Sequence, residues 1–193
     1  MNDPKAQFDA ETTEHVMTVL RDDGVYRHLV FARPGTGIWR FDLITWPGNL
    51  VITGDLESYH FAREHDMVDF FAAGRGINPD YWGEKVRGRT KLKRYSPEQF
   101  KQQVIAQFME DRHYLPGPNL PLWQAIRSEV LAYADDGEHE ARRALDNFRR
   151  QNYTFYDVWE WDFRDWDHHY LLCCHAIRWG VAKYRAEVTA RAA

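Results

Sequence analysis

The sequence has only two cysteines in 193 residues, and they are neighbours, Cys173 and Cys174. A disulfide between adjacent cysteines closes a strained ring, so a structural disulfide within the chain is not expected. Proteins that keep their thiols reduced are typical of the cytosol. The cysteine content therefore predicts a cytoplasmic protein.

The sequence also lacks a long apolar run. No segment approaches the ~20 consecutive apolar residues that span a bilayer. The first 15 residues are acidic and have no apolar core of the kind found in secretory signals. Neither membrane insertion nor secretion is therefore expected.

A surplus of positive charge is missing as well. The net charge is −4, which argues against a general attraction of the whole surface to nucleic acid but leaves room for a local basic patch. The sequence has no Walker loop, nucleophile elbow, dinucleotide fingerprint, HExxH or paired CxxC motif. We therefore expect no cofactor, and we favour binding over enzymatic activity.

The composition that remains is that of a globular protein. Apolar residues make up 44% and charged residues 28% of the chain, and the aromatic content of 15% is high. The length suits one full hydrophobic core or at most two small ones, and the loop 115–119 is too short for a domain linker. We expect one domain over residues 1–193.

The first half of the chain predicts a sheet. A helix is expected over residues 9–23, with Val16, Met17 and Leu20 on one face. Segments of alternating polarity follow, rich in β-branched and aromatic residues, and they predict an antiparallel meander. These segments are residues 25–33, 38–46, 50–53 and 58–63.

Short helices and one more strand are expected after the meander. Asp66 and Asn78 are typical residues to begin a helix, and Arg89 to Tyr95 could form a strand. Residues 8–95 are thus expected to be mostly sheet with short helices.

Residues 96–193 predict helices. Ser96 to Gln99 form a capping box with proline at the first helical position. The apolar residues expected on one stripe of this helix are Phe100, Val104, Ile105 and Phe108. Further helices are expected near residues 122–130 and 141–148. The fold class is therefore α+β, with an N-terminal antiparallel β-meander packed against a C-terminal helical bundle.

The last part of the chain, residues 153–184, holds four of the eight tryptophans. On a helical wheel it has two apolar sides, which predicts a long buried helix packed on both. Trp161, Leu172 and Trp179 form one line. The other line is formed by Phe163, Trp166, Tyr170, Cys173, Cys174, Ile177, Val181 and Tyr184. Aromatic residues on such a helix would serve a homo-oligomer interface as readily as a core.

A metal site near the start of this helix is the alternative interpretation. Asp165 lies three residues before His168 and four before His169, so each pair could share a helix face. His175 lies about 10 Å further along the helix axis, too far from His168 to share an ion. Asp165, His168 and His169 are therefore weak candidates, and packing is the favoured interpretation.

One segment concentrates positive charge. Six cations fall within ten residues with no acid between them, and they are Lys85, Arg87, Arg89, Lys91, Lys93 and Arg94. If residues 89–95 form a strand, Arg89, Lys91 and Lys93 share a face that suits phosphates or an acidic protein. The alternative is a solvated edge strand, since cations at an edge discourage unwanted pairing.

Polar residues also gather over residues 54–66. One interpretation of this segment is a site for acid–base chemistry. The other is a turn at Gly54-Asp55 followed by a helix cap at Asp66, which we favour. A metal-dependent hydrolase or nuclease, or a module that binds nucleotides or small ligands, remains the alternative to a binding protein.

Several short blocks resemble an uncharacterised group of tailed-phage and prophage proteins. They are WPGxL at residues 46–50 before TGD at 53–55, DMxxFF at 66–71, INPxYW at 77–82 and CCxAIxWG at 173–180. The resemblance implies a small cytosolic accessory protein that binds a host protein or a nucleoprotein complex. Inhibition of a bacterial defence system is one common role of such proteins. No catalytic residue is implied.

Overall fold

The chain forms two compact units in the computed structural model, which describes residues 3–192. Unit 1 combines the residues up to Leu92 with those from Trp166 onward, and unit 2 is the continuous segment Lys93–Asp165. Each unit has its own hydrophobic core. The expected single domain over residues 1–193 stays a prediction.

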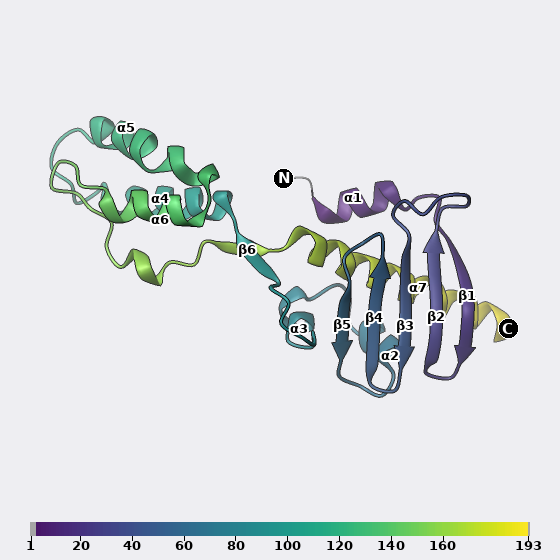
Figure 1. The fold of residues 1–193 in the computed structure, drawn as a ribbon. Helices are drawn as coiled ribbons and strands as arrows, with labels where there is room; N and C mark the ends of the chain where they lie inside the picture. Colours follow the sequence, from purple (N-terminus) through teal and green to yellow (C-terminus); the bar gives the residue numbers. More distant parts are fainter. Residues whose placement is uncertain (1–2, 193) are drawn as a thin grey trace. The chain divides into compact units, whose positions relative to one another are not determined.

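Unit 1 contains the predicted meander. Its five antiparallel strands lie in chain order, as Figure 1 shows. They are β1 (Val16–Asp23), β2 (Tyr26–Ala32), β3 (Phe41–Trp46), β4 (Asn49–Gly54) and β5 (Tyr59–Ala62). Leu29 pairs with Leu43, and Leu43 with Ile52, so one face of the sheet is a continuous apolar layer.

The predicted helix over residues 9–23 is wrong. The helix α1 spans Pro4–Glu11 and is capped by Asp3, whose side chain accepts from the backbone N–H of Lys5. Residues 16–23 form the edge strand β1 instead. Val16, Met17 and Leu20 fit a helical spacing, but Met17 and Val19 alternate toward the core while Val16 and Leu20 are exposed. Pairing with β2 thus overrides the helical pattern.

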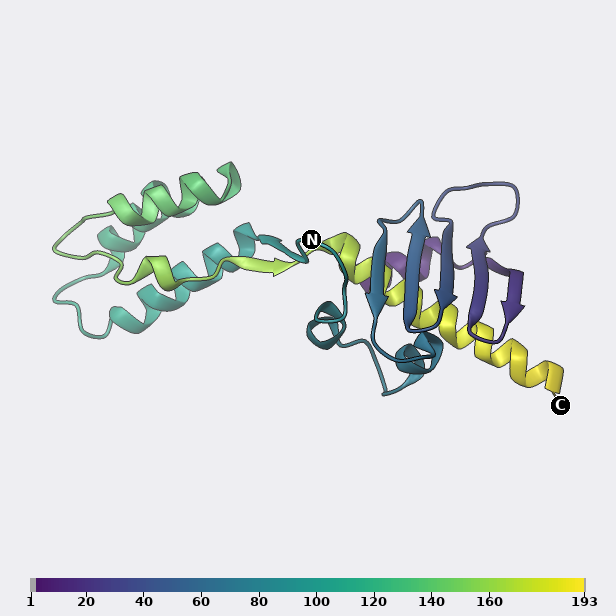
Figure 2. The ribbon, with the colours of Figure 1, turned by 60° about the horizontal axis from the view of Figure 1, so that its bottom comes forward.

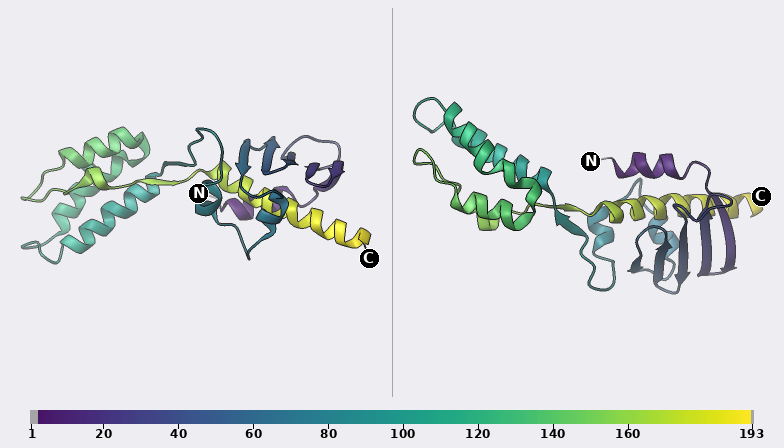
Figure 3. Two further views of the ribbon diagram at one scale, coloured as in Figure 1. Left: turned by 90° about the horizontal axis from the view of Figure 1, so that it is seen from below. Right: turned by 45° about the horizontal axis from the view of Figure 1, so that its top comes forward.

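Three further helices complete unit 1. They are α2 (Met67–Ala72), α3 (Pro79–Gly83) and α7 (His168–Ala192). The views in Figure 3 show α7 running along one face of the sheet, with α1 beside it. An added Cβ on Gly180 of α7 would lie 2.9 Å from a Leu43 methyl and 3.0 Å from the Phe31 ring, so a larger residue here would force these side chains to shift.

The predicted last helix is correct from Tyr170 onward, where the expected stripe through Tyr184 is buried. Its start is wrong, because Phe163 and Trp166 precede the helix and Trp161 follows a short 3₁₀ turn. The strand β7 (Arg164–Trp166) occupies this place. Asp167 then begins α7, since its carboxylate accepts from the Tyr170 N–H at 3.1 Å.

Unit 2 is mostly helical, as Figure 2 shows. Its elements are β6 (Lys93–Tyr95), α4 (Pro97–Asp111), α5 (Leu120–Glu129), the 3₁₀ helix η1 (Leu131–Asp136), α6 (Glu138–Asn147) and the 3₁₀ turn η2 (Val158–Glu160). β6 pairs with β7. Ser96 caps α4 by accepting from the Gln99 N–H at 3.2 Å. Ile105, expected on the buried stripe of α4, is 39% exposed.

The α+β fold class, with an N-terminal antiparallel meander and a long C-terminal helix, is therefore confirmed. The helices that the sheet packs against within unit 1 are α1, α2 and α7. Over the described residues 3–192, no helix is both long and apolar enough to cross a membrane.

Candidate functional site

The segment that carries the six predicted cations begins along the outer edge of β5. The backbone N–H of Ala62 donates to the Lys85 carbonyl at 2.9 Å, and the N–H of Arg87 donates to the His60 carbonyl at 2.7 Å. Val86 forms a bridge with Phe61 between these two bonds. Residues 85–87 are therefore held to the sheet by backbone hydrogen bonds.

The side chains of Lys85 and Arg87 have structural partners. The Lys85 ammonium lies 2.8 Å from Glu84 and 4.3 Å from the centre of the Tyr81 ring, and its side chain is only 14% exposed. The Arg87 guanidinium donates to the Ala62 carbonyl at 3.2 Å. These two cations therefore help to hold the segment in place.

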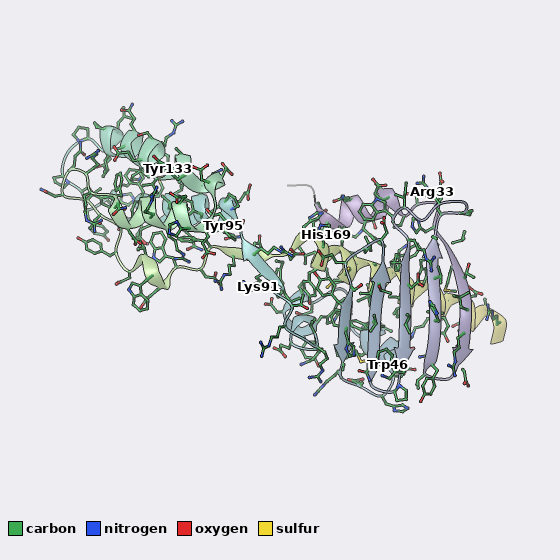
Figure 4. All side chains as sticks on the ribbon, in the orientation of Figure 1. Arg33, Trp46, Lys91, Tyr95, Tyr133 and His169 are labelled. Atoms are coloured by element: carbon green, nitrogen blue, oxygen red, sulfur yellow. The ribbon has the colours of Figure 1, made fainter. Side chains whose placement is uncertain are left out.

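Arg89 and Lys91 differ from this pair. Both are exposed, and within the described part of the chain neither makes a hydrogen bond or an ion pair. Figure 4 labels Lys91 in the irregular stretch before β6. Because residues 88–92 contain no carboxylate, the positive charge of this stretch is not neutralised by its own sequence.

The predicted strand over residues 89–95 is wrong in its first half, because β6 begins only at Lys93. Gly88, with φ of +95°, starts an irregular stretch that continues to Leu92. Arg89, Lys91 and Lys93 therefore do not share a strand face. Lys93 and Arg94 belong to unit 2, whereas the other four cations belong to unit 1.

The metal candidates also fall in different units. Asp165 lies in β7 of unit 2, whereas His168 and His169 open α7 in unit 1. His168 Nε2 lies 2.7 Å from Gln7 Oε1 of α1, so this ring joins two helices. Over residues 3–192, no group of three histidine, cysteine or acidic residues is placed to hold a metal ion.

The two cysteines are buried in the core of unit 1. The Cys173 thiol donates to the Glu57 carbonyl at 3.2 Å. Burial raises the pKa of the Cys174 thiol to about 12, so its reactive thiolate is scarce near neutral pH. This environment suits packing, as the sequence predicted.

Sequence reasoning missed a polar cluster at the end of the sheet. The Arg27 guanidinium donates to both carboxylate oxygens of Asp66, at 3.0 and 2.8 Å, and to the Tyr184 hydroxyl at 3.0 Å. Tyr184 donates in turn to Asp22 at 2.7 Å. The cluster joins β1, β2, α2 and α7. Asp66 also caps α2, as predicted.

A second missed cluster lies on the face of the sheet opposite α7. Asp42 is buried and lies 2.7 Å from His28 Nε2, and the Arg40 guanidinium donates to both of its oxygens at 3.0 Å. Burial raises the pKa of Asp42, but the hydrogen bonds from Arg40 and His28 outweigh it and hold the pKa below 3.8. With both oxygens engaged, this carboxylate is neither an open metal ligand nor a free base. The spacing of Arg40 and Asp42, two positions apart in the predicted strand 38–46, was the sequence signal for this pair.

Comparison with known proteins gave no family model, no curated protein and no solved structure that matches this chain.

Proposed function

We propose that this protein acts by stoichiometric binding to an acidic surface of a host protein or nucleoprotein complex. The setting that the sequence blocks favour is the cytoplasm of a bacterium that carries a phage or prophage, where binding would inhibit a defence system. One observation carries the proposal: Arg89 and Lys91 are exposed and unpaired next to a segment that the sheet holds in place.

The physical argument concerns the cost of binding. A flexible loop loses conformational entropy when it binds, and an anchored one loses less. The backbone bonds of residues 85–87 and the packing of Lys85 on Tyr81 fix one end of the cationic stretch before any partner arrives. Exposed cations then attract an acidic partner over about 8 Å at physiological salt.

The test compares two variants with the same change in net charge. The first replaces Arg89→Glu and Lys91→Glu. The control replaces Arg63→Glu and Arg127→Glu, two exposed arginines elsewhere on the chain. Tagged proteins are used to capture partners from bacterial lysate, before and after phage infection, at low and at physiological salt.

We expect the wild type and the control to retain a partner in a fixed ratio and the first variant to lose it. Capture that is unchanged by Arg89→Glu with Lys91→Glu would contradict the proposal. Stoichiometric metal in protein purified without a histidine tag would instead favour the metal-dependent hydrolase or nuclease.

A further inference from the structure

A groove in unit 2 lies outside the surface discussed so far. It has a volume of about 490 Å³ and runs between the last turns of α4 and the first turn of α5. Its lining is mostly apolar. The lining residues are Phe108, Met109, Arg112, His113, Asn119, Leu120 and Trp123.

Helix α4 carries more apolar residues than the core of unit 2 uses. Its inner side buries Phe100, Val104 and Phe108, whereas Ile105 and Met109 are 39% and 44% exposed. Across the groove, Leu120 at the start of α5 is 63% exposed. An apolar face that extends from one helix to the next is typical of an interaction surface.

The floor of the groove is preformed. The Phe108 and Trp123 rings stack with their centres 5.1 Å apart and their planes 20° apart. The Asn119 side chain donates to the Arg112 carbonyl at 2.9 Å and thereby ties the start of α5 to the end of α4. A partner would therefore meet a groove whose two walls are already joined.

The charge of the groove selects the partner. Arg112 brings a positive charge to the groove, and no carboxylate lines it. The nearby Asp111 carboxylate accepts from the Tyr153 hydroxyl at 2.8 Å and from Gln107 at 2.9 Å, so it is already engaged. A ligand with carboxylates beside large apolar side chains matches this combination.

We propose that the groove docks a segment of another protein that combines large apolar side chains with glutamate or aspartate. A second copy of the chain fits less well. A two-fold contact presents the same patch from both copies, so the positive charge of Arg112 would meet a patch that also carries Arg112 and no carboxylate.

The test selects ligands from a displayed library of random linear peptides, with the whole protein as bait and its Leu120→Glu variant for counter-selection. Leu120 is exposed, so this substitution leaves the core intact. An enriched peptide is then synthesised and titrated by fluorescence anisotropy, together with a version whose acids are replaced by lysine. The control is Ile38→Glu, because Ile38 is 67% exposed and lies in unit 1.

We expect enriched peptides to be both acidic and apolar, and their affinity to fall roughly tenfold or more in Leu120→Glu but not in Ile38→Glu. Arg112→Glu should weaken the binding of the acidic peptide and strengthen the binding of its lysine version. The Arg89→Glu, Lys91→Glu variant should bind the peptide normally, which separates this site from the proposed cationic one.

Three results of the peptide experiments would overturn the inference. They are the absence of enrichment over the counter-selected variant, enriched peptides without carboxylates, and an affinity that Arg112→Glu leaves unchanged. A dimer in sedimentation experiments that Leu120→Glu dissociates would also overturn it, because the occupant would then be a second copy.

Discussion

At the scale of single residues, Asp66 shows how one side chain serves two elements. It caps α2 through the Val68 N–H at 2.9 Å and pairs with the two terminal nitrogens of the Arg27 guanidinium. Burial raises the pKa of Asp66, but the hydrogen bonds from Arg27 and Val68 outweigh it and hold the pKa below 3.8. The stabilisation of the folded state by the ionised Asp66 carboxylate is therefore present above pH 3.8. It is lost as the pH falls through the lowered pKa.

Removing the partner of Asp66 should cost considerable stability. Arg27→Ala leaves a carboxylate that is only 19% exposed without its cation, and we expect a loss of about 3 kcal/mol in the free energy of unfolding. Urea denaturation at neutral pH measures it. The control Arg21→Ala removes an exposed ion pair with Asp23 and should cost less than about 1 kcal/mol. Equal losses in the two variants would show that the Arg27–Asp66 pair contributes no more to the free energy of unfolding than an exposed ion pair.

Gly54 offers a second prediction at this scale. Its φ is +130°, and an added Cβ would lie 2.5 Å from the Arg40 carbonyl oxygen, which is rigid backbone. Gly54→Ala should therefore destabilise the protein by about 3 kcal/mol, measured by urea denaturation. Gly37→Ala is the matched control, since its Cβ would meet nothing within 4 Å. A Gly54→Ala variant as stable as the wild type would contradict the close approach of Gly54 to the Arg40 carbonyl at the end of β4.

At the scale of secondary-structure elements, the contact between α1 and α7 contains a partly buried histidine. Burial lowers the pKa of His175 below 6.5, and nearby Lys5 lowers it further, while Asp3 and Asp9 oppose the shift. The neutral ring is thus favoured in the folded state. Its contribution to stability is complete above pH 6.5 and declines as the pH falls toward the lowered pKa.

The corresponding prediction concerns acid sensitivity. The free energy of unfolding should fall as the pH drops below 6.5, and His175→Gln should reduce this decline. His139→Gln, at an exposed histidine of α6, should leave the decline unchanged. Urea denaturation between neutral and mildly acidic pH provides the measurement. If the His175→Gln and wild-type curves stay parallel, the burial of His175 does not govern the acid response.

Sequence patterns predicted the start of a helix correctly where a capping residue alone determined it. The caps at Asp66, Asn78 and Ser96 all begin helices, because each side chain accepts from a nearby backbone N–H. The errors arose where tertiary pairing decided the outcome. β1 pairs with β2 although its residues suit a helix, and β7 pairs with β6 although Phe163 and Trp166 fit the stripe of α7.

The candidate sites show the same limit. The sequence located the cationic segment, but the hydrogen bonds that Lys85 and Arg87 form with β5 join residues more than 20 positions apart. Those long-range contacts help to separate the anchoring cations from Arg89 and Lys91. The groove in unit 2 was not predicted for a similar reason, because its lining residues come from both α4 and α5 and only tertiary packing brings them together.

At the scale of the whole molecule, the division into two units gives a prediction about folding. Unit 2 is continuous, its core includes Phe100, Phe108 and Phe163, and β6 and β7 bring its two ends together. A fragment of residues 93–165 should therefore fold alone, with a stability of about 3 kcal/mol typical of its size. Circular dichroism with urea denaturation checks it. A fragment that lacks helical signal or a cooperative transition would favour a single domain over the full chain.

Stoichiometric binding through Arg89 and Lys91 is tested most directly by calorimetric titration of a captured partner at several salt concentrations. We expect one fixed ratio, an affinity that falls as salt rises, and a weaker salt dependence in the Arg89→Glu, Lys91→Glu variant than in the Arg63→Glu, Arg127→Glu control. An affinity and a salt dependence that are the same in both variants would contradict the proposed role of Arg89 and Lys91.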